Sequence, residues 1–293
     1  MSAGLIAAQA VAAATPLVLA GVGELVAERA GVMNVGIEGL MLVGCCAGFA
    51  AVALGGGPLL GLAAAMAAGA VLAGIFAAVV VGLRGDQIVA GMALNLLALG
   101  ATGTAWQALQ GADHGDLDHA AAVACMDWFG PQVLGQSVMT WITLALAIAV
   151  AWLLAATRAG LILRSLGDSP EACAAAGIRV EWWRAGAVVA AGLCAGAAGA
   201  FLSIMRTRGF APGMTGGQGF LVLALVIFGR WRVGGLIIGA LGFGALNAYQ
   251  QQMQSQDMGA IVPYQVFLML PYVAALVVLC LRRPEKPLAT GAA

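Results

Sequence analysis

The chain has 293 residues, of which 62% are hydrophobic and only 9% are charged, and its formal net charge is zero. Soluble domains carry roughly a quarter of their residues as Asp, Glu, Lys or Arg, so this composition excludes an ordinary soluble domain and indicates a polytopic membrane protein. The sequence shows no basic tract, and nucleic acid is therefore not an expected partner.

The 43 glycines favour closely packed helices over a barrel, which would show alternating segments of about ten residues. A membrane span needs about 20 apolar residues. Spans are predicted, in chain order, at residues 5–23, 36–54, 58–82, 88–110, 138–157, 184–204, 233–250 and 261–281. We therefore expect an all-α polytopic membrane protein of about 8 to 9 transmembrane helices plus a half-helix, forming a single transmembrane domain over residues 1–293.

The half-helix is predicted at Gly219 to Gly229, an apolar piece that is too short to span a membrane. Eleven helical residues rise only about 16 Å against a hydrocarbon core of about 30 Å, so the helix should begin near mid-membrane. A faint internal repeat supports this, because Gly36 to Leu42 (Gly-Ile-Glu-Gly-Leu-Met-Leu) is similar to Gly216 to Val222 (Gly-Gly-Gln-Gly-Phe-Leu-Val). Two helices that start from opposite sides are typical of a transport site, whereas chance similarity among Gly-rich helices is the alternative.

The distribution of Lys and Arg predicts the orientation. Alternating the spans places Arg84, Arg158, Arg164, Arg179, Arg184, Arg230, Arg232, Arg282, Arg283 and Lys286 on one side, and only Arg206 and Arg208 on the other. The populated side is predicted to be cytoplasmic, with the tail 282–293 inside and the N-terminus outside. The outer loop, about 111–137, carries His114 and His119 among aspartates, but their spacing matches no metal template, and we expect a solvated acidic loop.

A polar island, Leu163 to Val180, lies in the predicted cytoplasmic loop of about 158–183. Ser169 is predicted to be a helix N-cap, Pro170 the first helical residue and Glu171 a carboxylate near the positive helix end, while Gly177 ends the helix. Such a two-turn helix is not stable alone, so it should dock on something. Another protein and the chain's own membrane domain are both open as the partner.

The residues predict no catalysis and no nucleotide site within this chain. A P-loop needs a lysine in GxxxxGK[ST], and the only lysine is Lys286 in the tail. The patterns GxSxG and HExxH do not occur either. Any ATP must therefore be bound by another chain, and no cofactor is expected in this one.

Polar side chains within apolar runs are costly, and each is a candidate for lining a transport path. They are Asn34, Glu38, Gln87, Asn95, Gln218 and Asn247, with Met214 and the ring of Phe220 nearby. Since all but Glu38 are neutral, the path is expected to suit an uncharged polar solute with a flat ring better than an ion. As alternatives, Glu38 could face a helix N-terminus, and the amides could be interhelical bonds worth about 0.6 kcal/mol each.

Four segments together resemble a known family. They are Glu28 to Leu42, Asp86 to Leu97, the Gly-Asp-Ser-Pro-Glu-Ala core of the polar island, and Gly216 to Trp231 followed by Met269 to Tyr272. They resemble the permease subunits of bacterial ABC importers, and within these the nucleoside (basic membrane protein) branch of the ribose-type permease superfamily, in particular the shorter of its two permeases. The resemblance covers nearly the whole chain and fades in the outer loop and the tail.

The resemblance implies a machine with several partners in a bacterial plasma (inner) membrane. These are a second homologous permease, a cytoplasmic ATP-binding subunit with two nucleotide-binding halves that holds ATP and Mg, and a substrate-binding lipoprotein outside. It also implies that Asp168, Ser169, Pro170, Glu171, Ala172 and Gly177 belong to a coupling helix that contacts the ATPase. The implied solutes are nucleosides. A sugar or other small polar solute is the alternative within the superfamily, and an ATP-independent secondary transporter is the alternative outside it.

Overall fold

The computed structural model describes residues 3–111 and 136–255 and shows an all-α polytopic membrane protein. Its elements are α1 (Ala3–Arg29), α2 (Ile37–Ala53), α3 (Pro58–Ala77), η1 (Ala78–Gly82), α4 (Gln87–Gly111), α6 (Val138–Ala156), α7 (Arg158–Asp168), α8 (Pro170–Ala175), α9 (Val180–Ala200), η2 (Phe201–Thr207), α10 (Gln218–Phe228) and α11 (Val233–Ser255). The elements η1 and η2 are π-helical turns that continue α3 and α9.

Within the described residues, six helices are long and apolar enough to cross a membrane. They are Ala7–Arg29, Pro58–Gly82, Gln87–Gln110, Val138–Ala156, Val180–Thr207 and Val233–Gln252. Each coincides with a predicted span, and the predicted half-helix is also present, as α10. The expected span at 261–281, nearly all of the outer loop and the tail lie outside the described residues.

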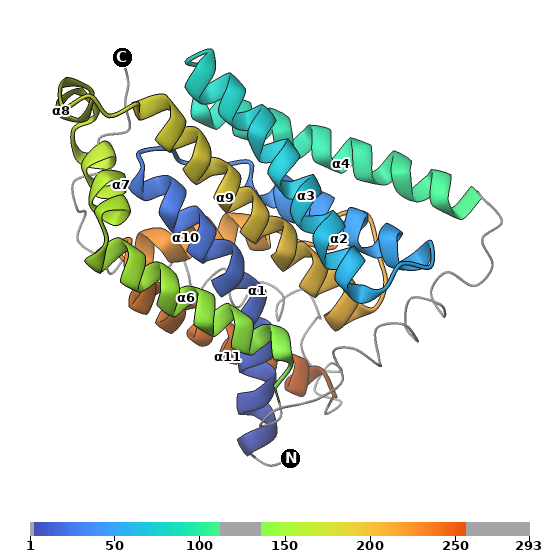
Figure 1. Cartoon of the computed structure of the whole chain (residues 1–293). Coiled ribbons are helices and arrows are strands. Elements are labelled where there is room, and N and C mark those ends of the chain that lie inside the picture. Colours follow the sequence, from blue (N-terminus) through green and yellow to red (C-terminus); the bar gives the residue numbers. More distant parts are fainter. Residues whose placement is uncertain (1–2, 112–135, 256–293) are drawn as a thin grey trace.

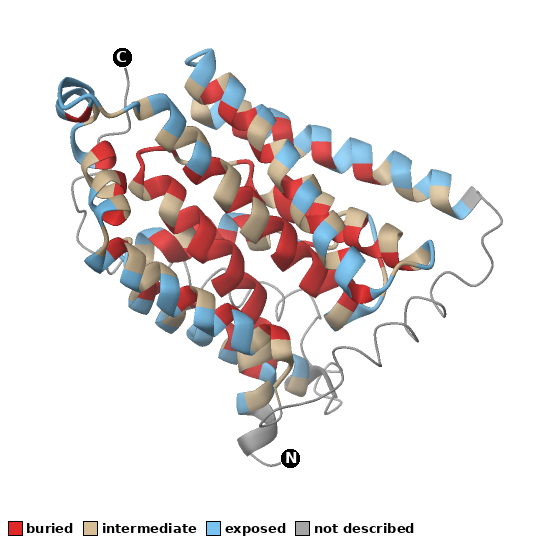
Figure 2. Ribbon diagram, in the orientation of Figure 1, coloured by how far each residue is buried: buried red, intermediate tan, exposed pale blue. Residues whose placement is uncertain are grey.

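The core is built around α1 and α9, which are the most buried of the long helices (Figures 1 and 2). Helix α1 packs against α9 and α11, and α9 packs in turn against α3 and α2. Glycine makes these contacts close, since a Cβ atom on Gly196 of α9 would lie 2.2 Å from the carbonyl oxygen of Ala65 on α3. Small residues that let backbones approach are the usual means of helix association in membranes.

Helices α4 and α6 lie at the periphery and expose most of their apolar side chains (Figure 2). Met92 and Leu96 of α4 are 57% and 71% exposed, and Trp152 of α6 is 65% exposed. Such faces are unfavourable in water but suit the hydrocarbon region of a bilayer or another membrane helix. The pattern agrees with the membrane assignment.

Helix α1 is longer than the sequence predicted. The span was expected to end at residue 23, before Glu24, whereas the helix continues to Arg29 and buries both Glu24 and Glu28, which are 0% and 4% exposed. The helix continues because the protein interior supplies hydrogen bonds to these carboxylates, from the Asn34 backbone amide and the Trp231 indole. Buried charged groups are tolerated only with such partners.

Two of the apolar helices are shorter than the others, and their starts lie close together. Helix α2 has 17 residues and α10 has 11, so they rise only about 26 Å and about 16 Å. Helix α10 packs against both α1 and α2. The half-helix was predicted, whereas residues 36–54 were predicted to form a full span and instead form the shorter helix α2.

Candidate functional site

The starts of α2 and α10 meet at Glu38, in the first turn of α2, and we call this meeting point the half-helix junction. Glu38 Oε1 accepts hydrogen bonds from Thr215 Oγ1 at 2.5 Å and from the Gly217 amide at 2.9 Å, and its Oε2 accepts one from the Gly219 amide at 2.6 Å. The first amides of a helix have no partner within it and carry the positive end of its dipole. The N-cap residue of α10, Gly217, has no side chain, so a carboxylate from another helix caps α10.

Glycine allows this close approach. A Cβ atom on Gly219 would lie 2.5 Å from both the Cα and the backbone nitrogen of Glu38. Gly217 has φ of 85°, a left-handed conformation that residues with a side chain rarely adopt. The glycines at the start of α10 therefore have two roles: Gly219 lets the two backbones come close, and Gly217 turns the chain into the helix.

The start of α2 is capped from α4. Asn95 Oδ1 accepts a hydrogen bond from the Gly39 amide at 2.7 Å, and Asn95 Nδ2 donates one to the Val35 carbonyl at 3.0 Å. Asn34, which is fully buried, accepts a hydrogen bond from the Gly36 amide through Oδ1 at 3.1 Å. The side chains of Asn34 and Asn95 thus hold the backbone that leads into α2. That they also contact a solute stays a prediction.

Gln87 performs a similar role at the other end of the same segment, where its Oε1 accepts a hydrogen bond from the Met33 amide at 2.8 Å. Asn34, Gln87 and Asn95 are therefore brought together along the chain between α1 and α2.

The two candidate residues on α10 lie at the half-helix junction. Gln218 is the first residue of α10, and Phe220 is 47% exposed in its first turn.

Asn247 is the one candidate that the structure places elsewhere. It lies on α11, where its Oδ1 accepts hydrogen bonds from Arg206 Nη2 at 3.1 Å and from Gln251 Nε2 at 2.8 Å. These partners belong to η2 and to α11 itself, and not to the half-helix junction. Asn247 therefore lies apart from the other side-chain amides that were predicted to line the transport path.

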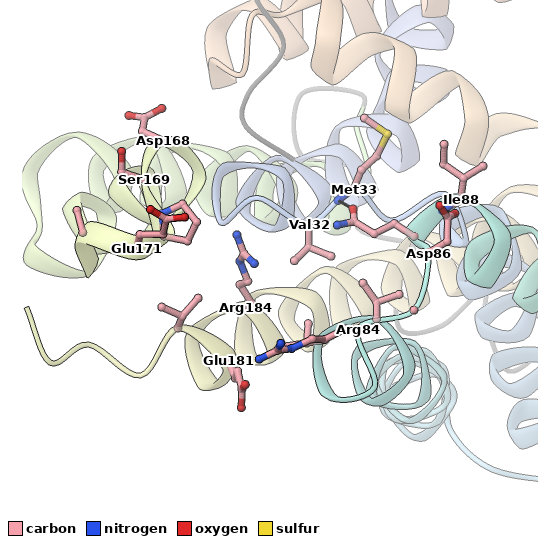
Figure 3. A pocket seen from close by; sticks show the side chains of 17 residues that line it. Val32, Met33, Arg84, Asp86, Ile88, Asp168, Ser169, Glu171, Glu181 and Arg184 are labelled. Atoms are coloured by element: carbon pink, nitrogen blue, oxygen red, sulfur yellow. Dashed lines mark hydrogen bonds between the residues drawn. The ribbon is translucent and has the colours of Figure 1, made fainter. Parts of the chain in front are cut away.

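A cavity of about 1140 Å³ opens at the end of the molecule that holds α8 (Figure 3). One wall is the start of α8, another is the start of α9, and a third is the turn between η1 and α4. Val32 and Met33, from the segment that leads into α2, lie at its inner side. In Figure 3, Asp168 and Glu171 lie on one side of this cleft and Arg84 and Asp86 on the other.

Helix α8 has the form that the polar island predicted. Pro170 occupies its first turn, and Gly177, with φ of 80°, ends it in a Schellman motif: Gly177 N donates to the Ala174 carbonyl and Ile178 N to the Cys173 carbonyl. Ser169 is at the N-cap position, but its hydroxyl makes no capping hydrogen bond, contrary to the expectation for this residue type. Its backbone amide instead donates to the Ser165 carbonyl of α7.

The surface of α8 is open. Asp168, Ser169, Glu171, Ala172 and Gly177 are exposed and Pro170 is half-buried, while Cys173 is the buried residue of the helix. The helix touches its own chain through α7 and α9. Whether another protein covers the exposed side stays a prediction.

Several polar residues that are buried or half-buried were not predicted from the sequence. The Trp231 indole donates to Glu28 Oε2, and Arg29 Nη2 donates to the Trp231 carbonyl at 2.7 Å, so the end of α1 is fastened to the turn between α10 and α11. Arg184 of α9 donates through Nε to the Ala30 carbonyl at 3.1 Å. The available signal was the pair Glu24 and Glu28, four residues apart and therefore on one helix face.

Within residues 3–111 and 136–255, no group of three or more His, Cys, Asp or Glu side chains could hold a metal ion. The acidic segment with His114 and His119 lies outside the described residues. The described part of the chain thus offers helix ends, amides and a cleft, which can bind and reorient a solute or a partner.

An α-helical membrane protein in which a short apolar helix begins inside the protein, as α10 does at Glu38, has a feature that transport proteins share. The chain belongs to the family described as branched-chain amino acid transport system / permease component, whose sequence profile matches residues 6–271. Permease components of ABC transporters work with an ATPase and a substrate-binding component, and the permease itself is generally not an enzyme.

Three transporter permeases are similar in sequence to this chain. A putative glucose ABC transporter permease of Haloferax volcanii is 35% identical over 87% of this chain and 79% of its own length. A guanosine ABC transporter permease of Bacillus subtilis is 33% identical over 95% of this chain and 92% of its own length. A nucleoside ABC transporter permease of Lactococcus lactis is 30% identical over 91% and 88%. No solved structure matches the chain at a significant level.

Proposed function

We propose that this permease component imports nucleosides, together with a second homologous permease, a cytoplasmic ATPase with two nucleotide-binding halves and an external substrate-binding lipoprotein. The similarity to the guanosine and nucleoside permeases carries the proposal, because it extends over 95% and 91% of this chain. The neutral amides along the segment leading into α2 and at the start of α10 are compatible with an uncharged polar solute. ATP and Mg would be held by the ATPase.

A sugar is the second candidate. The putative glucose permease is 35% identical, but the alignment covers 87% of this chain and 79% of that protein, less than for either nucleoside relative. Amides and backbone groups bind sugar hydroxyls as readily as the ribose and base of a nucleoside. The choice between these solutes therefore needs a direct measurement.

The proposed mechanism is alternating access in the bacterial plasma membrane. The end of the molecule with α8 would face the cytoplasm, and the N-terminus would lie outside. The exposed helix α8 would dock on the ATPase through Asp168 to Ala172 and Gly177. Binding of ATP would then move α8 and reorient the helices around a cavity between the two permeases, so that the solute passes from the binding protein to the inside.

Two measurements test the proposal. The cognate external lipoprotein should bind nucleosides more tightly than pentoses or hexoses in titration calorimetry. Proteoliposomes with the complete complex should take up labelled guanosine only when ATP and an active ATPase are present. Preferred binding and uptake of glucose would favour the sugar alternative, and guanosine uptake without the ATPase would indicate a secondary transporter.

A further inference from the structure

The segment Ala30 to Gly36, which we call the linking segment, connects the end of α1 to the start of α2. Its residues Val32 and Met33 line the cleft beside α8, and its last residues lead directly into the half-helix junction. The linking segment thus contacts both functional regions of the molecule.

At the cleft, the linking segment rests on the elements that carry α8. A Cβ atom on Gly167, the penultimate residue of α7, would lie 2.5 Å from the Arg29 carbonyl oxygen, and one on Gly31 would lie 3.4 Å from the Cα of Gly167. Gly31 has φ of 84°, so the chain turns sharply there. The end of α7, which leads into α8, is therefore in direct backbone contact with the first residues of the linking segment.

Arg184 makes the side-chain contact between α9 and this segment. It lies in the second turn of α9, beyond the short connection from α8, and its Nε donates to the Ala30 carbonyl at 3.1 Å. It also lines the cleft, where Figure 3 shows its side chain between Glu171 and Val32. Its Nη2 is buried without a hydrogen-bond partner in the described structure. A buried unpaired donor is rare, so a second arrangement that satisfies it would be favourable.

Toward the junction, the linking segment is hydrogen-bonded at almost every step. The Met33 amide donates to Gln87, the Asn34 amide donates to Glu24 Oε1 at 2.9 Å, and the Val35 carbonyl accepts from Asn95. Glu38 follows and caps α10. The segment is therefore held along its length by side chains of α1 and α4, and it continues into the start of α2. Such a contiguous network is a physical route for coupling when its ends have two arrangements.

We propose that Arg184 is a positioning residue that transmits movement of α8 to the half-helix junction, through its hydrogen bond to Ala30 and the linking segment. This inference rests on the proposed docking of an ATPase on α8. Arg29 and Glu28 hold the turn at Trp231 against the end of α1. That attachment provides a fixed frame against which the linking segment moves.

The test is hydrogen–deuterium exchange of the assembled permease–ATPase complex, with and without a non-hydrolysable ATP analogue. In the wild type, exchange should change both in α8 with the turn that ends it (residues 170–177) and in the linking segment (residues 30–36). In Arg184→Met, which removes every donor, the α8 response should remain and the linking-segment response should fall at least threefold. Arg184→Lys, which keeps the charge but loses the planar fork, should give an intermediate response.

The matched control is Arg164→Met, because Arg164 Nε donates to the Gly160 carbonyl of its own helix α7. Its linking-segment response should equal that of the wild type. The inference is overturned if the linking segment responds fully in both Arg184 variants, or if it does not respond in the wild type although α8 does. If α8 itself shows no response in the wild type, the proposed docking is wrong and the inference loses its basis.

Discussion

Glu38 and Gly219 join the starts of two short apolar helices: the carboxylate of Glu38 accepts a hydrogen bond from the backbone amide of Gly219 at 2.6 Å. The contact is close because Gly219 has no side chain, and a Cβ atom there would lie 2.5 Å from the Glu38 Cα. A negative charge at a helix N-terminus is favourable, and here it comes from a residue 181 positions earlier in the chain. The junction therefore depends on the carboxylate of Glu38 and on the absence of a side chain at Gly219.

Gly219→Ala should destabilise the protein because the new methyl group collides with the backbone of α2. Overpacking of this kind typically costs about 1–3 kcal/mol. The melting temperature in detergent should fall. Gly100→Ala is the matched control, since a Cβ atom on Gly100 in α4 meets nothing within 4 Å and alanine favours a helix. Equal melting temperatures for the two variants would contradict the close contact.

Substitutions around Glu38 should rank in order of the hydrogen bonds that they remove. Thr215→Val removes one bond, Glu38→Gln removes the charge and one acceptor, and Glu38→Ala removes all three bonds. Hydrogen bonds to charged groups contribute about 1.5–3 kcal/mol each. Denaturant unfolding should show the smallest loss for Thr215→Val and the largest for Glu38→Ala. A reversed order would mean that the carboxylate is not the main cap of α10.

Glu24 offers a test of the buried acid in α1. Glu24→Gln keeps an oxygen that can accept from the Asn34 amide, whereas Glu24→Leu leaves that amide buried without a partner. An unsatisfied buried donor costs about 1–3 kcal/mol, so the leucine variant should unfold at a lower denaturant concentration than the glutamine variant. If the leucine variant were the more stable one, the hydrogen bond to Asn34 would contribute little.

Glu171→Lys and Pro170→Gly should uncouple ATP hydrolysis from uptake without blocking membrane insertion. The first reverses the charge on the exposed face of α8, and the second removes the residue that fixes its first turn. Uptake in proteoliposomes should fall about tenfold or more, while basal ATP hydrolysis by the complex persists. Glu171→Gln, which only neutralises the charge, should have a smaller effect. Unchanged uptake in all three variants would exclude α8 as the docking helix.

Asn95→Ala and Asn247→Ala should separate the two groups of amides. Asn95 holds the start of α2 with two backbone hydrogen bonds, whereas Asn247 bonds to Arg206 and Gln251. If the path passes the junction, Asn95→Ala should change the order in which nucleosides and sugars compete for uptake, with basal ATP hydrolysis little changed. Asn247→Ala should leave that order intact. Equal effects on competition and on basal hydrolysis would indicate purely structural amides.

The sequence predicted the helices well where apolar length or special residues decide the structure. The half-helix at Gln218–Phe228 followed from an apolar run too short to span a membrane, and the end of α8 followed from Gly177. In each case the signal is local, so a short stretch of chain contains the information.

The rest depends on contacts between distant segments. The first span was expected to end before Glu24 because a carboxylate is costly in an apolar run, and only the fold shows that the Asn34 amide donates to Glu24 Oε1. The side-chain cap expected from Ser169 is absent, and its backbone amide continues the hydrogen bonding of the preceding helix α7. Likewise, no local pattern could show that Asn247 lies beside Arg206, away from the other amides.

The capping of α10 by Glu38 also bears on which solutes the protein can reject. A free helix N-terminus is a ready anion site and would attract a phosphate group. Here the amides of Gly217 and Gly219 are already bound by a carboxylate, whose negative charge opposes a second anion. A nucleoside and its monophosphate differ by that group alone. If the solute path passes the junction, as proposed, nucleoside monophosphates should not compete with nucleosides for uptake.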